Sequence, residues 1–243
     1  MRARKKKNTV PRLERVSDYL IGAVPAHPRG EIRVEVGCGK GKFVTALAKD
    51  HPNVTFYALE KIPDVIVMAA EKAAREEIGN VKFLLADAKD LTEGIEKKFM
   101  GLDENRNPIL EDVAHEALCP SKAVSVLYLN FSDPLPNKKH AHLRLTHRSF
   151  LEKYRTILKE DGHIEFKTDN RDLFDFAVEE VPFSVFRIDQ ITYDLHNDFD
   201  MNAGNIMTEY EARFSAKGNP IFKYILCRKD DLPASGSARE NME

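Results

Sequence analysis

Tryptophan is absent from the 243-residue sequence, and cysteine is scarce, with only Cys38, Cys119 and Cys227. These cysteines are odd in number and far apart, which indicates a reducing compartment and provides no paired spacing for a metal. No apolar run approaches the roughly 20 residues that a membrane-spanning helix requires. The basic start, residues 1–7, is followed by polar residues instead of the apolar core of a secretory signal. We therefore expect a cytoplasmic protein with no membrane partner.

The formal net charge is only -2, but the charged residues are unevenly distributed. Basic residues crowd positions 1–7 and 138–155, and acidic residues gather at 90–116. A polyanion responds to local charge, so the small net charge does not exclude a nucleic-acid partner. The amino-terminal run fits a solvated face equally well, whereas the central run follows a candidate active-site loop.

The sequence is organised around residues 34–43, VEVGCGKGKF. Residues 32–36 predict a buried strand, the three glycines predict a tight turn, and the apolar spacing that follows predicts a helix. Glycine lets a ligand lie against the backbone, so the turn is a candidate small-molecule site. A dinucleotide fingerprint requires its third glycine at Lys42 instead of Gly41, which disfavours nicotinamide. The pattern resembles the glycine loop of class I methyltransferases, which bind S-adenosylmethionine; a purely structural turn is the alternative.

Strands and helices alternate along the chain, which predicts an α/β fold with a parallel sheet. Further strands are predicted at 54–59, 81–86, 123–129, 164–167, 183–195 and 220–227, and helices at 16–21, 63–79, 147–159 and 171–180. We expect a basic N-terminal arm (1–30), a single domain (31–227) with a surface insertion at about 91–122, and a disordered tail (228–243).

Four motifs occur in order: EVGCGKG at 35–41, YLNFSDP at 128–134, FKTDN at 166–170 and TEYE at 208–211. Together they resemble the bacterial tRNA (guanine-N7)-methyltransferases, which methylate a guanosine in the variable loop of tRNA. The resemblance covers about residues 32–224. It implies a Rossmann-like class I methyltransferase fold, with a seven-stranded mostly parallel sheet and helices on both faces. It also implies S-adenosyl-L-methionine as donor, S-adenosyl-L-homocysteine as product and tRNA as substrate.

The resemblance implies that four acids at strand ends line the donor site: Glu35, Glu60, Asp87 and Asp133. It also implies contacts from Gly37, Gly39, Gly41 and Ala88. A sulfonium cation, an amino group and two ribose hydroxyls are complemented by carboxylates, which supply charge and paired acceptors. Glu60 is placed for the ribose and Asp87 for the adenine, with helix capping or a loop position as the alternative role for each.

Asp133 matches the family's catalytic position, in a loop that Pro134 and Pro136 stiffen. Guanine N7 already carries a lone pair and loses no proton on methylation, so attack requires no general base. We therefore expect Asp133 to orient the base and to stabilise the cationic product, while in-line positioning supplies most of the rate.

The family's guanosine side is matched by Asp169 and by Thr208, Glu209, Tyr210 and Glu211. Guanine presents two adjacent donors on its Watson–Crick edge, and one carboxylate accepts both, so Glu211 or Asp169 is the candidate reader. Thr208 followed by Glu211 is also a capping box, and the two roles can coexist.

The family's RNA contact is matched by a stretch that contains Asn137, Lys138, Lys139, His140 and Arg144. The stretch departs from the family where Leu135 replaces a tryptophan and Asn137 replaces a lysine. Fewer phosphate contacts weaken RNA affinity and flatten its salt dependence. His140, His142 and His147 lie among lysines and arginines that repel a cation, so no metal site is expected.

The residues leave three functions open. The first is the tRNA methyltransferase, and the second is a small-molecule or protein methyltransferase of the same fold, which the basic stretch disfavours. The third is a non-catalytic or weakly active RNA-binding relative, which Leu135 and Asn137 favour and the four acids at strand ends disfavour. A monomer and a homodimer are equally compatible with the sequence.

Overall fold

Seven strands form one sheet in the computed structural model, which describes residues 8–92, 95–102, 108–114 and 117–229. Every neighbouring pair is parallel except those that involve the sixth strand in the order, which runs antiparallel to both of its neighbours. The expected seven-stranded, mostly parallel sheet is confirmed. The strand order is β3 (Val81–Leu85), β2 (Val54–Glu60), β1 (Glu31–Val36), β6 (Val124–Asn130), β7 (Leu158–Thr168), β9 (Phe222–Arg228) and β8 (Phe186–Thr192).

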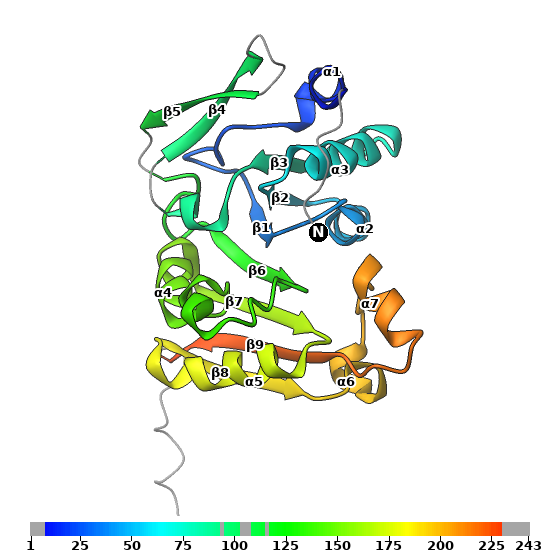
Figure 1. Ribbon diagram of the computed structural model, residues 1–243, viewed down its shortest axis with the longest axis vertical. Coiled ribbons are helices and arrows are strands. Elements are labelled where there is room, and N and C mark those ends of the chain that lie inside the picture. Colours follow the sequence, from blue (N-terminus) through cyan, green and yellow to red (C-terminus); the bar gives the residue numbers. More distant parts are fainter. Residues whose placement is uncertain (1–7, 93–94, 103–107, 115–116, 230–243) are drawn as a thin grey trace, which may run out of the picture.

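Helices cover both faces of this sheet (Figure 1). Strand β2 shows why, because Phe56 and Ala58 pack into one apolar core while Tyr57 and Leu59 pack into the other. A strand that is buried on both faces reads as a continuous apolar run, as 54–59 does. One core includes α2 (Lys42–Asp50) and α3 (Pro63–Arg75), and the other includes α4 (Arg148–Ile157) and α5 (Arg171–Glu180).

The described part of the amino-terminal segment is packed onto the domain and does not stand free of it. A helix is present at α1 (Thr9–Arg15), earlier than the predicted 16–21, and the short helix η1 (Ser17–Tyr19) follows it. Val10 and Leu13 are buried, and Arg12 forms an ion pair of 2.6 Å with Glu71 of α3. The short helix η1 lies within the predicted 16–21, whereas α1 is not predicted, because its basic residues obscure its apolar face in the sequence.

The region predicted as a surface insertion contains a separate antiparallel pair of strands, β4 (Ile95–Leu102) and β5 (Pro108–Ala114). In Figure 1 this pair lies apart from the main sheet. The short helix η2 (Ala88–Leu91) precedes it, and Leu118 and Cys119 after it are buried in the domain. The predicted insertion at 91–122 therefore contains two strands, and it ends before residue 118. Residues 103–107, the centre of its acidic turn, lie outside the described residues.

The fifth predicted strand is longer than expected because helix α4 ends at Ile157 instead of 159. Strand β7 starts at Leu158 opposite Val124 and resumes its pairing at His163, so residues 159–162 form an irregularity inside the strand. A Cβ at Gly162 would lie 2.8 Å from the carbonyl oxygen of Val124, which accounts for glycine there. The remaining elements are η3 (Lys138–Leu143), η4 (Val181–Phe183), η5 (Leu195–Asn197), α6 (Phe199–Asn202) and α7 (Glu209–Ser215).

Within the described ranges, no helix combines the length and the apolar composition that crossing a bilayer requires.

Candidate active site

The strand order brings five acids to neighbouring strand ends. Asp87 follows β3, Glu60 ends β2, Glu35 lies near the end of β1, Asp133 follows β6 and Asp169 follows β7. These strands are adjacent and parallel, so their carboxyl ends share one edge of the sheet, where α/β proteins bind ligands. In Figure 1 the tips of β6 and β7 point toward α6 and α7.

The glycine loop has the left-handed backbone that its sequence predicts. The φ angles of Gly37, Gly39 and Gly41 are 78°, 56° and 75°. The amides of Gly37 and Cys38 both donate to the carbonyl oxygen of Leu59 at 2.9 Å, which fixes the loop against the end of β2. A Cβ built on Gly37 or Gly39 meets no atom within 4 Å, so the backbone there is open to a ligand.

Gly41 differs from the other two because it touches helix α3. A Cβ at this position would lie 2.7 Å from the Cβ of Ala69, on a backbone that L-residues disfavour. We predict that Gly41→Ala lowers the free energy of unfolding by about 3 kcal/mol, the sum of the left-handed cost and of overpacking. Gly218→Ala is the control, since Gly218 has a φ of 80° with nothing within 4 Å. Urea denaturation measures both variants, and equal losses would contradict the packing argument.

Glu60 holds the glycine loop from the neighbouring strand. One carboxylate oxygen accepts from the amide of Gly39 at 3.2 Å, and the other accepts from the amide of Ile62 at 3.0 Å. Burial raises the pKa of Glu60, and these amides oppose the rise. The carboxylate is therefore placed between the glycine loop and the entry to α3.

Asp87 caps a helix, which is the role considered above as the alternative to adenine binding. Its Oδ1 accepts from the amide of Lys89, and the carboxylate of Asp90 accepts from the amide of Asp87, each at 3.2 Å. Together these bonds form a capping box at η2, with Ala88 buried behind it. A cap leaves lone pairs of the carboxylate available, so a ligand role for Asp87 stays a prediction.

Glu35 is the most deeply buried of these acids, with 3% of its surface exposed. Its Oε1 accepts from the amide nitrogen of Asn130 at 3.0 Å, while its buried Oε2 has no hydrogen-bond partner among the described residues. Burial raises the pKa of Glu35 to about 7, against the Asn130 bond, the charge of Lys167 and the backbone amide of Val44 at the start of α2, which faces the carboxylate without meeting hydrogen-bond geometry at Oε2. An unpartnered buried acceptor with such a pKa is typical of a ligand site.

The loop that carries Asp133 is strained on both sides. Phe131 and Leu135 have φ angles of 51° and 41°, which are uncommon for residues with a Cβ. The amide of Phe131 donates to the carbonyl of Lys167 at 2.9 Å, and Arg144 donates to the carbonyl of Leu135 at 3.1 Å. Asp133 itself is exposed between these two anchors. Backbone strain that the surroundings enforce is a feature of functional loops.

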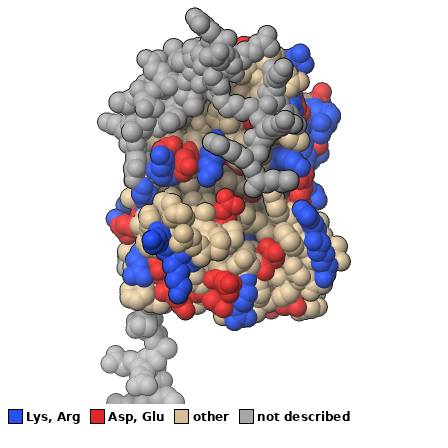
Figure 2. Space-filling view, viewed as in Figure 1, with Lys and Arg blue, Asp and Glu red and all other residues tan. Residues whose placement is uncertain are grey.

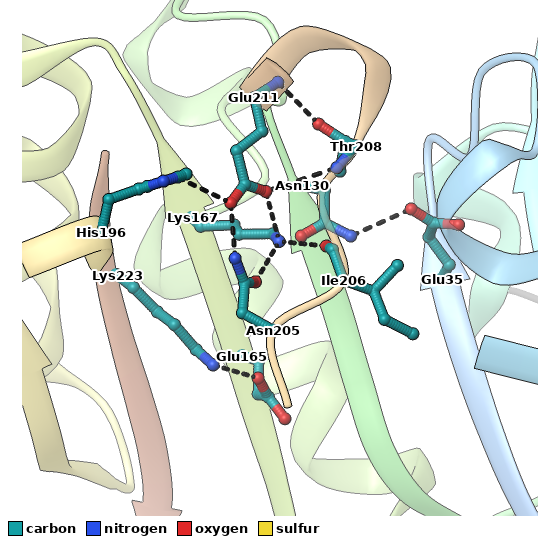
Figure 3. A network of polar contacts seen from close by, with 10 residues as sticks. All are labelled: Glu35, Asn130, Glu165, Lys167, His196, Asn205, Ile206, Thr208, Glu211 and Lys223. Carbon is teal, nitrogen blue, oxygen red and sulfur yellow. Dashed lines mark hydrogen bonds and ion pairs between the residues drawn. The ribbon is translucent and has the colours of Figure 1, made fainter. Parts of the chain in front are cut away.

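The segment at 208–211 forms a complete capping box, in which Thr208 accepts from the amide of Glu211 at 2.9 Å (Figure 3). The Glu211 carboxylate is fully buried and contacts Lys167 and Asn205, each at 2.6 Å, and His196 at 3.1 Å. Both of its oxygens thus face protein groups. This arrangement shows the capping role named as the alternative for Glu211, and a contact between Glu211 and the guanine edge stays a prediction.

The other members of the guanosine-side set are accessible. Tyr210 is 56% exposed and stacks on Phe131 with ring centroids 6.2 Å apart. Glu209 forms an ion pair of 3.5 Å with Lys40 of the glycine loop, so α7 contacts both the donor side and the Asp133 loop. Asp169 is partly exposed and has no hydrogen bond or ion pair within the described part of the chain.

The basic stretch divides into outward and inward residues. Lys138, Lys139 and His140 of η3 are exposed, and the Asn137 side chain caps η3 by accepting from the amide of Lys139 at 3.0 Å. Arg144 points inward, with its guanidinium 4.3 Å from the Phe176 ring centroid, so it supports the Asp133 loop instead of presenting a free cation. In Figure 2, Lys and Arg side chains are interspersed with acidic ones and do not form one continuous basic surface.

The histidines of this stretch do not gather around a metal position. Across the residues described, no group of three or more His, Cys, Asp or Glu side chains is arranged to hold a metal ion. His147 caps α4 by accepting from the amide of Ser149 at 3.2 Å.

A cavity of about 380 Å³ lies away from these acids. Its lining comes from α4 and from the segments before β6, at the amino-terminal edge of the sheet. The lining residues are Thr92, Ala117, Cys119, Ser121, Glu152, Lys153, Thr156 and Ile157.

Four polar residues of the site were missed in the sequence: Asn130, Lys167, His196 and Asn205. Asn130 and Lys167 lie inside the motifs, and the available signal is a polar or charged side chain near the end of each of these two strands. His196 and Asn205 carry no local signal, since their partner Glu211 contacts them only through the tertiary fold.

A seven-stranded sheet of this order, with a glycine loop after its first strand and acids at the neighbouring strand ends, defines a class I methyltransferase. Solved structures share the fold. A 16S rRNA methyltransferase, KamB, matches with a TM-score of 0.54 at 12% identity, over 89% of this chain and 92% of that one. An antibiotic-related methyltransferase matches with a TM-score of 0.53 at 15% identity, over 92% and 95%.

Relatives with similar sequences identify the family within this class. A family described as "Putative methyltransferase" matches residues 29–101 and 110–224. The tRNA (guanine-N(7)-)-methyltransferase of Lachnoclostridium phytofermentans is 40% identical over 200 residues, which covers 82% of each chain. That of Bacillus cytotoxicus is 36% identical over 234 residues, 92% of this chain and 95% of the relative. The chain belongs to the tRNA (guanine-N7)-methyltransferase family.

Proposed function

We propose that this protein transfers the methyl group of S-adenosylmethionine to N7 of a guanine in the variable loop of tRNA. The observation that carries the proposal is the juxtaposition of Glu35, Glu60 and the open glycine loop with the strained loop of Asp133, on neighbouring strand ends. The family relationship supports the same acceptor and the same donor.

The residues at the donor side fit S-adenosylmethionine. The unpartnered Oε2 of Glu35 and the bare backbone at Gly37 and Gly39 are features that a cationic nucleoside would complete. Glu60 is the candidate acceptor for the ribose hydroxyls, and Asp87 with Ala88 for the adenine. When bound, the donor supplies an electrophilic methyl group on a sulfonium centre.

The protein's own contribution is to hold guanine N7 in line with that methyl. Positioning of two reactants lowers the activation free energy by about 7 to 11 kcal/mol. One carboxylate about 4 Å from the developing positive charge stabilises the transition state by roughly 4 kcal/mol at an intermediate dielectric. Asp133 is exposed in the free protein, so its charge reaches this strength only once RNA covers the loop. Asp133 therefore orients and stabilises the base, and the strained backbone keeps it in place.

We assign the guanine edge to Asp169. It is partly exposed at the end of β7, two residues after Lys167, whose carbonyl anchors Phe131. Its carboxylate can accept both donors of the Watson–Crick edge. Tyr210, stacked on Phe131, offers an aromatic face to a base.

The exposed lysines of η3 are proposed to contact RNA phosphates. We predict that Lys138→Ala/Lys139→Ala weakens tRNA binding and flattens the slope of log affinity against log salt by about 0.7 to 0.9 for each contact. Lys122→Ala is the control, because Lys122 is exposed at the opposite edge of the sheet and pairs with Glu160. Filter binding across a salt series measures the slopes, and unchanged slopes in the double variant would remove η3 from the interface.

The proposed activity is tested by incubating the purified protein with unmodified tRNA and methyl-labelled S-adenosylmethionine, and then mapping the labelled base. We expect label at guanine N7 in the variable loop. Label in a metabolite or protein pool instead would favour a methyltransferase with another substrate. Binding of tRNA without any transfer would favour the RNA-binding relative.

A further inference from the structure

Lys167 connects the two sides of the proposed site. It lies at the carboxyl end of β7 with 5% of its side chain exposed. Its backbone carbonyl accepts from Phe131 in the Asp133 loop. Its ammonium lies 5.0 Å from the ring centroid of Phe43, at the start of helix α2 after the glycine loop.

The same ammonium holds the segment that leads into α7 (Figure 3). It donates to the side-chain oxygen of Asn205 and to the carbonyl of Ile206, each at 2.9 Å, and to Glu211 at 2.6 Å. Asn205 in turn donates to the other oxygen of Glu211 at 2.6 Å. An ammonium has three donors, and here three acceptors from one short segment take them.

These contacts surround the first turn of α7, which carries Tyr210. The last turn is held separately by Phe214, which packs against the apolar cluster of Leu195, Met201 and Ile221. The helix spans only Glu209–Ser215, and Glu211 is its buried residue. Its surface contacts toward the site are the half-exposed Lys40–Glu209 pair and the Tyr210–Phe131 stack. An exposed ion pair contributes little, so the position of Tyr210 depends on the buried anchor.

We propose that Lys167 is a positioning residue that fixes α7 and Tyr210 against the Asp133 loop through its ion pair with Glu211. This inference rests on the proposed function and deepens it, because Glu211 then acts by placing its helix and does not touch the base. A buried ion pair contributes little net stability, whereas loss of one partner leaves an unpaired charge. The ion pair therefore serves to fix the position of α7 at the substrate side of the site.

The absence of tryptophan gives a direct readout. Tyr210→Trp introduces a single indole at the tip of α7, stacked on Phe131, and its quenching by acrylamide reports whether the helix is held. In this background we expect Lys167→Met to raise the quenching constant about 2-fold, because α7 loses its anchor and opens locally. This measurement needs no catalytic activity.

Lys223→Met is the matched control. Lys223 pairs with Lys167 in register on β9 and forms a partly buried ion pair of 2.8 Å with Glu165, but it does not contact the segment before α7. We expect unchanged quenching in this variant. Asn205→Ala is a milder second test, since it removes two bonds of the anchor without unpairing a charge, and it should raise quenching in the same direction.

In the otherwise unmodified protein, Lys167→Met should lower kcat/KM for tRNA roughly 100-fold, as misplacement of a binding element does. Lys167→Met/Glu211→Met, which removes both charges, should recover part of this loss. The proposal is overturned if Lys167→Met and Asn205→Ala leave the quenching constant and kcat/KM at parent values. It is also overturned if Lys223→Met changes the quenching constant and kcat/KM as much as Lys167→Met does. If the parent protein itself methylates no tRNA, the proposed function fails while the quenching result still decides the role of Lys167.

Discussion

Asp133→Asn slows methyl transfer about 100- to 1,000-fold in a single-turnover reaction with enzyme, donor and tRNA preassembled. The change removes one charge beside the developing cation and keeps the size of the side chain. A stabilisation of roughly 4 kcal/mol corresponds to a factor near 1,000, and the loss of single electrostatic groups in other enzymes spans the same range. Positioning by the loop remains, so the variant should retain a measurable rate. Rapid quench of labelled donor measures the transfer step.

Two controls isolate the chemistry in this experiment. Asp161→Asn removes an exposed acid from the irregular part of β7, at the other edge of the sheet, and should transfer at the parent rate. Direct binding measurements set the concentrations at which Asp133→Asn is saturated with tRNA and donor, so that a loss of affinity does not enter the measured transfer rate. A single-turnover rate that equals the parent rate would remove Asp133 from the mechanism.

Glu35→Gln should lower the affinity for S-adenosylmethionine about 100-fold at pH 8, because a neutral amide replaces a buried carboxylate that faces a cation. In the parent protein, affinity should rise with pH through about 7, where Glu35 ionises. The variant should lack this dependence. Isothermal titration calorimetry between pH 6 and pH 8 measures both effects, and Glu31→Gln on the same strand is the control.

Glu35→Gln should raise the stability of the folded protein at pH 8, although it lowers the affinity for the donor. The pKa of Glu35 is raised from 4.5 to about 7 on folding, so the folded protein retains a proton that the unfolded chain releases between these values. Stability is therefore lost as pH rises through this window, by about 3 kcal/mol at one pKa unit per 1.36 kcal/mol. Glu35→Gln keeps the Asn130 bond and removes that loss, so its Tm should exceed the parent's at pH 8. An equal or lower Tm would contradict the burial argument.

The sequence predicted the parts of the site that depend on neighbouring residues in the chain. A β-branched run followed by alternate glycines specifies its own strand and turn, and acids that directly follow apolar runs are placed by the ends of those strands. The helix predicted at 171–180 likewise begins at a local signal, since the side chain of Asn170 accepts from the amide of Leu173 at 2.8 Å. Local chemistry sufficed in each of these cases.

The failures involve contacts across the fold. The motif at 208–211 indicates the capping box of Glu211 but not its ion pair with Lys167, which is 44 positions away in the chain. The hairpin of β4 and β5 was missed because its strands pair only with each other, outside the main sheet. Helix α1 was not predicted because the apolar face that packs on α3 is narrow and lies among arginines.

The left-handed backbone at Phe131 and Leu135 also has a consequence for how the chain reaches its working form. Such conformations are disfavoured by roughly 1 kcal/mol or more each, and here they persist through the Lys167 carbonyl and the Arg144 guanidinium. Both partners come from later in the sequence than the turn itself. The turn therefore gains its supports only when β7 and the segment behind η3 dock against it, so the side of the site that receives the guanine is completed late in folding.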